Sequence, residues 1–222
     1  MNLEKEYEII SSEVKNFLID YEGKLNEFDL YMGTQILFSQ LIHKPKFMFI
    51  GINPGQGYFK EKGVKVREFG AQKEFEYLDN TYKLATETKD IFSRAGCTTD
   101  LETAVKTNWI FFATKNAKDL NSLLSNMRNR HKITLEPIFD SWVKRIIELI
   151  QPKIIICEGK AAFDRVTWNI LPEARTVWGD GLGYIKTYDG IHILGYKRIF
   201  SNIKDKDLVA NKIKEILQQD LV

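Results

Sequence analysis

Asn53 is the first side chain in this sequence whose type and surroundings could support chemistry. It lies in the stretch KFMFIGINPGQGY, from Lys46 to Tyr58, among three glycines and a proline. Such residues let the backbone turn sharply and approach a ligand closely. An amide offers a hydrogen-bond donor and an acceptor in one plane, so it could orient a water or hold a polar ligand. The same pattern is also typical of an ordinary turn, and composition alone favours the turn.

The element that must position Asn53 is the apolar run from Phe47 to Ile50. A short, wholly apolar run favours a strand buried on both faces of a parallel sheet over an amphipathic helix. In open α/β sheets ligands bind beyond the carboxyl ends of the strands. The sequence therefore predicts that Asn53 lies at a ligand-binding edge.

The segment GINPG after an apolar strand resembles the first motif of the uracil-DNA glycosylase superfamily. The match is closest to the mismatch-specific uracil and thymine-DNA glycosylase branch, with the single-strand-selective branch a near second. The resemblance implies that Asn53 positions the water that attacks the sugar carbon. It also implies an extruded base in a pocket formed by Gly51, Ile52, Gln56 and the aromatic residues Tyr58 and Phe59.

The segment TNWIFFATKNAKDL resembles the stretch of thymine-DNA glycosylases that lies across the base-binding pocket. Its apolar run, 109–113, is expected to be a second central strand. Asn108, Thr114 and Asn116 could read a base edge through donors and acceptors. Alternatively, Thr114 and Asn116 cap the helix that follows, and both interpretations can hold together.

The remaining pattern alternates helices with apolar strands. Helical periodicity predicts helices over 3–21, 28–42 and 138–150, and residues 91–95 are expected to be the end of a helix closed by Gly96. The run 154–157 is a further buried strand before Gly159 and a small-residue helix. This alternation predicts an α/β fold, a three-layer α/β/α sandwich. The resemblance refines it to a uracil-DNA glycosylase-like fold with a mostly parallel four-stranded sheet. The block from 139 to 166 supports the fold and says little about catalysis.

The last loop departs from the superfamily pattern. A strand over 191–194 should lead into the loop 195–206 and a closing helix over 208–217. Superfamily members carry His-Pro-Ser, Asn-Pro-Ser or Met-Pro-Ser in this loop, whereas this chain has no proline after Pro172. Ser201 and Asn202 are the catalytic candidates that remain. Lys197, Arg198 and Lys204 are candidate contacts to a DNA backbone, although a solvated helix face accounts equally for Lys204.

Composition limits the class of protein. The chain has 222 residues, 44% of them hydrophobic, enough for one α/β domain over 1–222 that includes an N-terminal helical segment over 1–42. A net charge of +2 means that any DNA-binding face would have to be a local patch.

Lysines and aromatic residues are interspersed over 60–87, which suits either a nucleic-acid groove or a solvated face whose aromatic side chains point inward. Two cysteines are too few for a disulfide framework, which indicates a protein of the reducing cytosol. The N-terminus is charged and no apolar run is long enough to cross a membrane, so we expect no membrane segment.

The resemblance implies a DNA glycosylase of base excision repair, and we expect the protein to be cytoplasmic and monomeric. It would hydrolyse the N-glycosidic bond of uracil or a related damaged or mismatched base in DNA, without a metal or other cofactor. The alternative keeps the fold but drops the reaction: a superfamily member that binds nucleic acid or a nucleobase without cutting. A third reading takes the glycine loop as a phosphate cradle, but the loop lacks the P-loop lysine and the G-x-G-x-x-G spacing.

Overall fold

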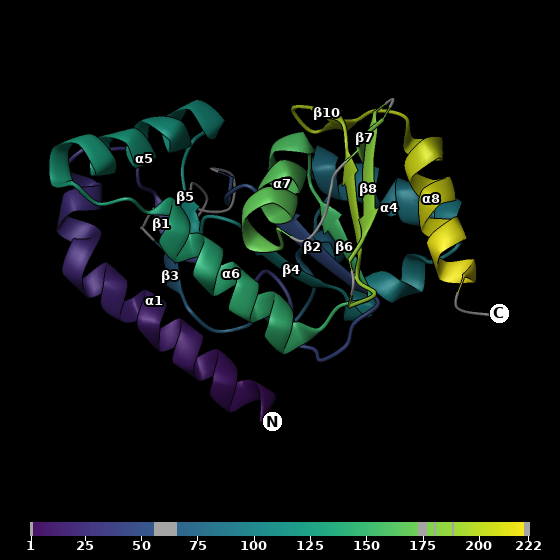
Figure 1. Cartoon of the computed structure of the whole chain (residues 1–222), viewed down its shortest axis with the longest axis horizontal. Helices are drawn as coiled ribbons and strands as arrows, with labels where there is room; N and C mark the ends of the chain where they lie inside the picture. The colour runs from purple at the N-terminus through teal and green to yellow at the C-terminus, as the bar shows by residue number, and fades with distance from the viewer. Residues whose placement is uncertain (1, 56–65, 173–176, 180, 188, 220–222) are drawn as a thin grey trace.

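A computed structural model describes residues 2–55, 66–172, 177–179, 181–187 and 189–219 of the chain. The protein is built on a central sheet with helices on both faces (Figure 1). The sheet contains β2 (Phe47–Gly51), β4 (Val105–Asn108), β6 (Ile154–Cys157), β7 (Val177–Trp178), β8 (Leu182–Lys186) and β9 (His192–Tyr196), in the spatial order β4-β2-β6-β9-β8-β7.

The sheet is mostly parallel. Strands β4, β2, β6 and β9 pair in parallel, and β8 and β7 extend the sheet by antiparallel pairing. The expectation of a mostly parallel sheet is therefore confirmed, but the expected number of four strands was too small, because the sheet has six. The extension arises because the segment before β9 folds back on it as a hairpin.

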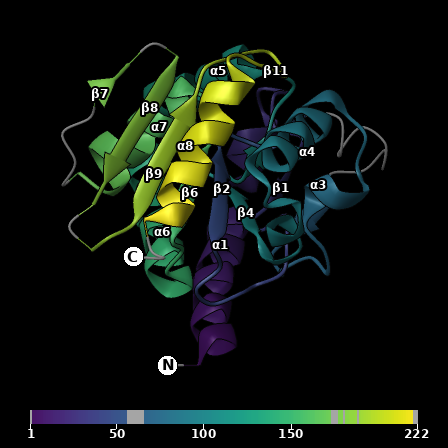
Figure 2. The same cartoon turned by 90° about the vertical axis from the view of Figure 1, so that its right-hand side faces the viewer.

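The helices form an outer layer on each face. One layer contains α1 (Leu3–Asn26), α5 (Ala117–His131), α6 (Glu136–Ile150), α7 (Lys160–Arg165) and the π-helical η2 (Val166–Ile170). The other contains α3 (Glu76–Asp79), α4 (Lys83–Ala95), the 3-10 helix η1 (Thr98–Thr103) and α8 (Lys206–Gln218). Figure 2 shows this second side, on which α4 and α8 pack together.

Alternate strand residues face the two layers, as the two-residue period of a strand requires. Met48 and Ile50 of β2 pack with the α1, α5 and α6 layer, whereas Phe47 and Phe49 pack with α4 and α8. All four side chains are completely buried. The prediction that this apolar run forms a strand buried on both faces is therefore confirmed.

Two segments differ from their sequence-based expectation. Residues 28–42 do not form a helix, because Gly33–Gln35 is strand β1, which pairs with β3 (Val66–Glu68) and β5 (Phe112–Ala113) in a separate small sheet. The central strand predicted over 109–113 instead spans Val105–Asn108. Its residues Lys106, Thr107 and Asn108 are polar but buried, so the segment lacks the apolar character by which a central strand is recognised.

Helix α1 continues to Asn26 rather than ending at 21, whereas several other boundaries agree with the sequence. Helix α4 ends at Ala95 and is capped by Gly96 in the left-handed conformation, with φ of 73°. Helix α6 ends at Ile150, before Pro152, and β6 covers the predicted 154–157. Among the described helices, none is both long and apolar enough to cross a bilayer.

Candidate functional site

A cavity of about 440 Å³ lies beyond the carboxyl ends of β2, β4 and β6. Its walls come from the loop after β2, the ends of β4 and β6, the segment 76–84 that leads into α4, and the hairpin of β10 (Arg198–Ile199) and β11 (Asn202–Ile203). Segments far apart in the sequence thus meet at the edge of the sheet where a ligand was expected.

The loop after β2 is held in place by the chain beyond β4. The N–H groups of Trp109 and Ile110 donate to the carbonyls of Gly51 and Ile52, at 2.8 and 2.9 Å. These bonds continue the parallel pairing of β2 and β4 past the strand ends. Gly51, Ile52 and Asn53 consequently line the cavity.

Asn53 is half-buried, and its amide is fixed in rotation. Its Nδ2 lies 3.0 Å from Thr114 Oγ1, 3.1 Å from the Pro54 carbonyl oxygen and 3.3 Å from the Phe112 carbonyl oxygen, so these three acceptors share its two N–H donors. The nitrogen is therefore engaged by its own loop and by β5. Because both amide groups share one plane, this also fixes where the oxygen Oδ1 can accept a hydrogen bond.

The three polar candidates of the second motif have different surroundings. Asn108 ends β4, is 4% exposed and lines the cavity. Thr114 instead supports Asn53, and its own hydroxyl donates to the Asn116 carbonyl at 2.9 Å. Asn116 is the N-cap of α5, accepting from the Asp119 N–H at 3.0 Å, so the capping interpretation holds for it.

The last loop brings only part of its predicted residues to the cavity. Ser201 and Arg198 line it. The Arg198 side chain packs against Gly159: a Cβ added to Gly159 would lie 3.3 Å from Nε of Arg198. Of the described residues, Asn202, Lys197 and Lys204 lie outside the lining and are exposed. Asn202 pairs with Ile199, the neighbour of Arg198, and adjacent side chains of a strand face opposite sides, so Asn202 lies on the side of the hairpin away from Arg198.

Three predicted pocket residues, Gln56, Tyr58 and Phe59, lie outside the described part of the chain. The same holds for the lysines Lys60, Lys62 and Lys65 of the basic and aromatic segment. Of the aromatic residues of that segment, Phe75 and Tyr77 are buried, which agrees with the inward-facing interpretation.

Sequence reasoning missed a buried charged cluster in the cavity wall, formed by Lys106, Tyr77, Glu158 and Glu76. The Lys106 ammonium donates to the Tyr77 hydroxyl, which in turn donates to Oε1 of Glu158. Nζ of Lys106 lies 3.5 Å from that Oε1 and 2.9 Å from Oε2 of Glu76. Lys106 thus lies between two carboxylates, as a buried ammonium requires.

Burial and charge determine the protonation of Tyr77. Its pKa is raised well above the ordinary value, first by complete burial and then by the Glu158 carboxylate. Its hydroxyl therefore remains a donor to Glu158 near neutral pH. At the cavity rim, the Tyr82 hydroxyl donates to Oε1 of Glu76 at 2.6 Å.

Glu158 could have been found from the sequence by the rule that singled out Asn53. It follows the apolar strand Ile154–Cys157 directly, so it lies at the same carboxyl edge of the sheet. The block that was expected to support the fold and to say little about catalysis thus also supplies Glu158 to the cavity wall.

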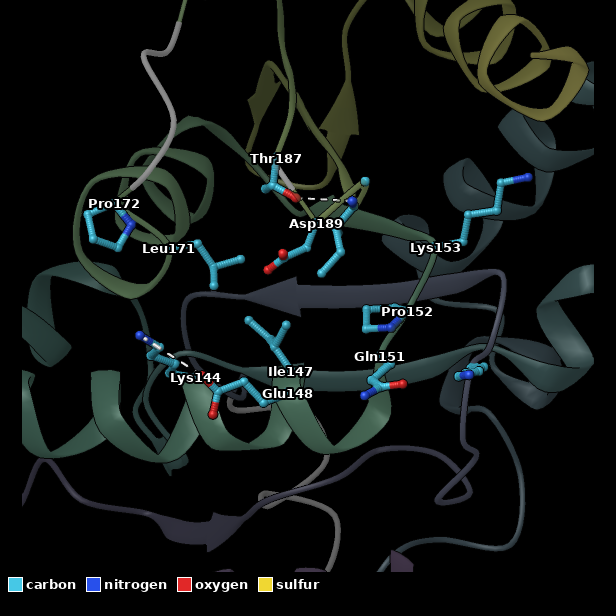
Figure 3. A pocket seen from close by; sticks show the side chains of 13 residues that line it. Lys144, Ile147, Glu148, Gln151, Pro152, Lys153, Leu171, Pro172, Thr187 and Asp189 are labelled. Carbon is cyan, nitrogen blue, oxygen red and sulfur yellow. Dashed lines mark hydrogen bonds and ion pairs between the residues drawn. The ribbon is translucent and has the colours of Figure 1, made fainter. Parts of the chain in front are cut away.

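A larger hollow, of about 660 Å³, lies at the opposite end of the strands, beside the residues that precede β6 and β9 (Figure 3). Figure 3 shows Ile147 and Leu171 pointing into it, with Lys144 and Glu148 at one rim. Nζ of Lys144 lies 3.9 Å from Oε1 of Glu148. None of its lining residues belongs to the predicted site. We therefore assign the candidate site to the smaller cavity, where amide, carboxylate and cationic groups converge.

Comparison with known proteins supplies no family, since no family model matches the chain and no curated protein matches it.

Proposed function

We propose that this protein is a DNA glycosylase that hydrolyses the N-glycosidic bond of uracil or a related damaged or mismatched base. The observation that supports this most is the meeting of Asn53 with Arg198 and Ser201 at one cavity, with Asn108 in its wall. Cleavage of this bond needs a held base, a placed water and stabilisation of the charges that develop. The cavity holds a side chain suited to each task.

Each residue has a definite role in the proposed reaction. The amide of Asn108 binds the edge of the extruded base. The hydrogen bonds on the Asn53 nitrogen fix its amide, so that Oδ1 accepts from the attacking water and orients it. The Arg198 guanidinium stabilises the negative charge that develops on the departing base.

The hairpin β10–β11 gives the cavity a rim suited to DNA. Lys197 and Lys204 are exposed beside it and would contact phosphates. Phe200 is 90% exposed at the hairpin tip, next to the cavity residue Ser201. An apolar side chain presented in this way can insert between base steps and hold a distorted duplex open.

The test is release of free base from oligonucleotides that contain one uracil, opposite guanine, opposite adenine or in a single strand. We expect release by the wild-type protein and at least a hundredfold slower release by Asn53→Ala. The matched control is Asn116→Ala, which removes an exposed asparagine that caps α5 and does not line the cavity. If neither uracil nor any related base is released at high protein concentration, the proposal is wrong.

A second candidate function is nucleobase or DNA binding without cleavage. It is favoured by the engagement of the Asn53 nitrogen with the carbonyl of its own neighbour, Pro54, together with the atypical last loop. DNA binding that weakens steeply with salt, without any product, would support this candidate instead.

A further inference from the structure

Two acceptor oxygens converge on Gly51 in the wall of the cavity. Asn108 lies opposite Gly51 in the β2–β4 register, and Glu158 follows β6 on the other side of β2. A Cβ added to Gly51 would overlap Oδ1 of Asn108 and lie 2.9 Å from Oε2 of Glu158. Both oxygens therefore occupy the space that a side chain at this position would fill.

The two oxygens of Glu158 have different surroundings. Oε1 accepts from the Tyr77 hydroxyl and lies 3.5 Å from the Lys106 ammonium. Oε2 makes no hydrogen bond to any residue that the structure describes, although Glu158 is only 3% exposed. Because Glu158 lines the cavity, the lone pairs of this oxygen are available to a ligand that supplies hydrogen-bond donors.

From this geometry we infer that the cavity selects a base with an exocyclic amino group over the corresponding keto base. This inference rests on the proposed function and narrows its substrate class. An amino group such as N4 of cytosine carries two hydrogens, one for each of the two oxygens, and carboxylates accept from it. A keto oxygen at the same place, as in uracil, would face the Glu158 oxygen without a hydrogen between them.

The experiment compares bases that differ only in this group. Oligonucleotides carrying 5-hydroxycytosine or 5-hydroxyuracil, in single strands and in duplexes, are assayed for base release. Binding of free cytosine and free uracil is measured by calorimetry, which separates recognition of the base from recognition of DNA. We expect the wild-type protein to favour the amino member by at least tenfold in release and in binding.

The diagnostic variant is Glu158→Gln, which keeps the shape of the side chain but can turn an N–H toward a keto oxygen. We expect the preference to fall below threefold or to reverse. If this variant does not fold, Asn108→Ala removes the other oxygen and leaves Glu158 with Tyr77 and Lys106; the preference should again decrease.

The outcomes separate this inference from the proposed function. Equal or better handling of the keto member by the wild type overturns the inference and leaves the glycosylase in place. A folded Glu158→Gln protein that retains the amino preference also overturns it. If the wild type releases no base and binds none, both the inference and the proposed function are wrong.

Discussion

Oδ1 of Asn108, at the end of β4, and Oε2 of Glu158, just after β6, both crowd the position that a Cβ on Gly51 would occupy. The absence of a side chain at position 51 is therefore what brings an amide and a carboxylate together at the carboxyl edge of the sheet.

Gly51→Ala should destabilise the fold and abolish ligand binding. The added methyl group would displace Asn108 and Glu158, and overpacking of this kind costs about 1–3 kcal/mol. Urea unfolding measures the loss. Gly23→Ala is the matched control, because Gly23 lies in α1 with open space around it, so alanine there should raise stability by about 0.5–1 kcal/mol. An unchanged stability in Gly51→Ala would contradict the geometry.

Lys106→Met should cost about 3–5 kcal/mol in the free energy of unfolding, because two carboxylates would lose the buried cation between them. Lys144→Met is the control, since Lys144 is half-exposed and 3.9 Å from Glu148, and such surface pairs contribute about 0–1 kcal/mol. Adding Glu158→Gln to Lys106→Met should recover part of the loss in a double-mutant cycle. Strict additivity of the two substitutions would show that these groups are not coupled.

Stability should decrease in mild acid because of His192. The pKa of this imidazole is lowered to about 4 by burial and then by the positive charges of Lys186, Lys153 and Lys212. The unfolded chain, with an ordinary histidine pKa of about 6.5, takes up the proton first. Stability is therefore fully present above about pH 6.5 and is lost as the pH falls toward about 4, by roughly 1–3 kcal/mol. Denaturant unfolding from pH 7 to 4 should show a shallower decline in His192→Gln.

Phe200→Ala should weaken DNA binding at least fivefold while leaving the melting temperature unchanged, because the ring is 90% exposed and contributes little to the core. Fluorescence anisotropy with a labelled duplex measures the affinity. Ile19→Ala is the control, since Ile19 is a 73% exposed apolar residue on α1, away from the hairpin. Equal effects of the two substitutions would exclude a specific role for the hairpin tip.

Local sequence patterns were enough to predict the strands over 47–50 and 154–157, the end of a helix at Gly96 and the position of Asn53 after a strand. Each of these depends on neighbouring residues: a short apolar run, or a glycine where the chain must adopt positive φ. The same local reasoning placed Arg198 and Ser201 in a loop after the last strand, although it could not separate them from Lys197 and Asn202.

The burial of particular polar residues depends on contacts with segments that are distant in the sequence. Lys106 lies in a strand with a polar sequence. Its buried charge is balanced by the carboxylates of Glu76, earlier in the chain, and Glu158, later in the chain. Thr114 and Asn116 differ in role because only one of them reaches Asn53. A buried ion pair or hydrogen bond depends on a partner that is distant in sequence, so no local pattern around either residue can reveal it.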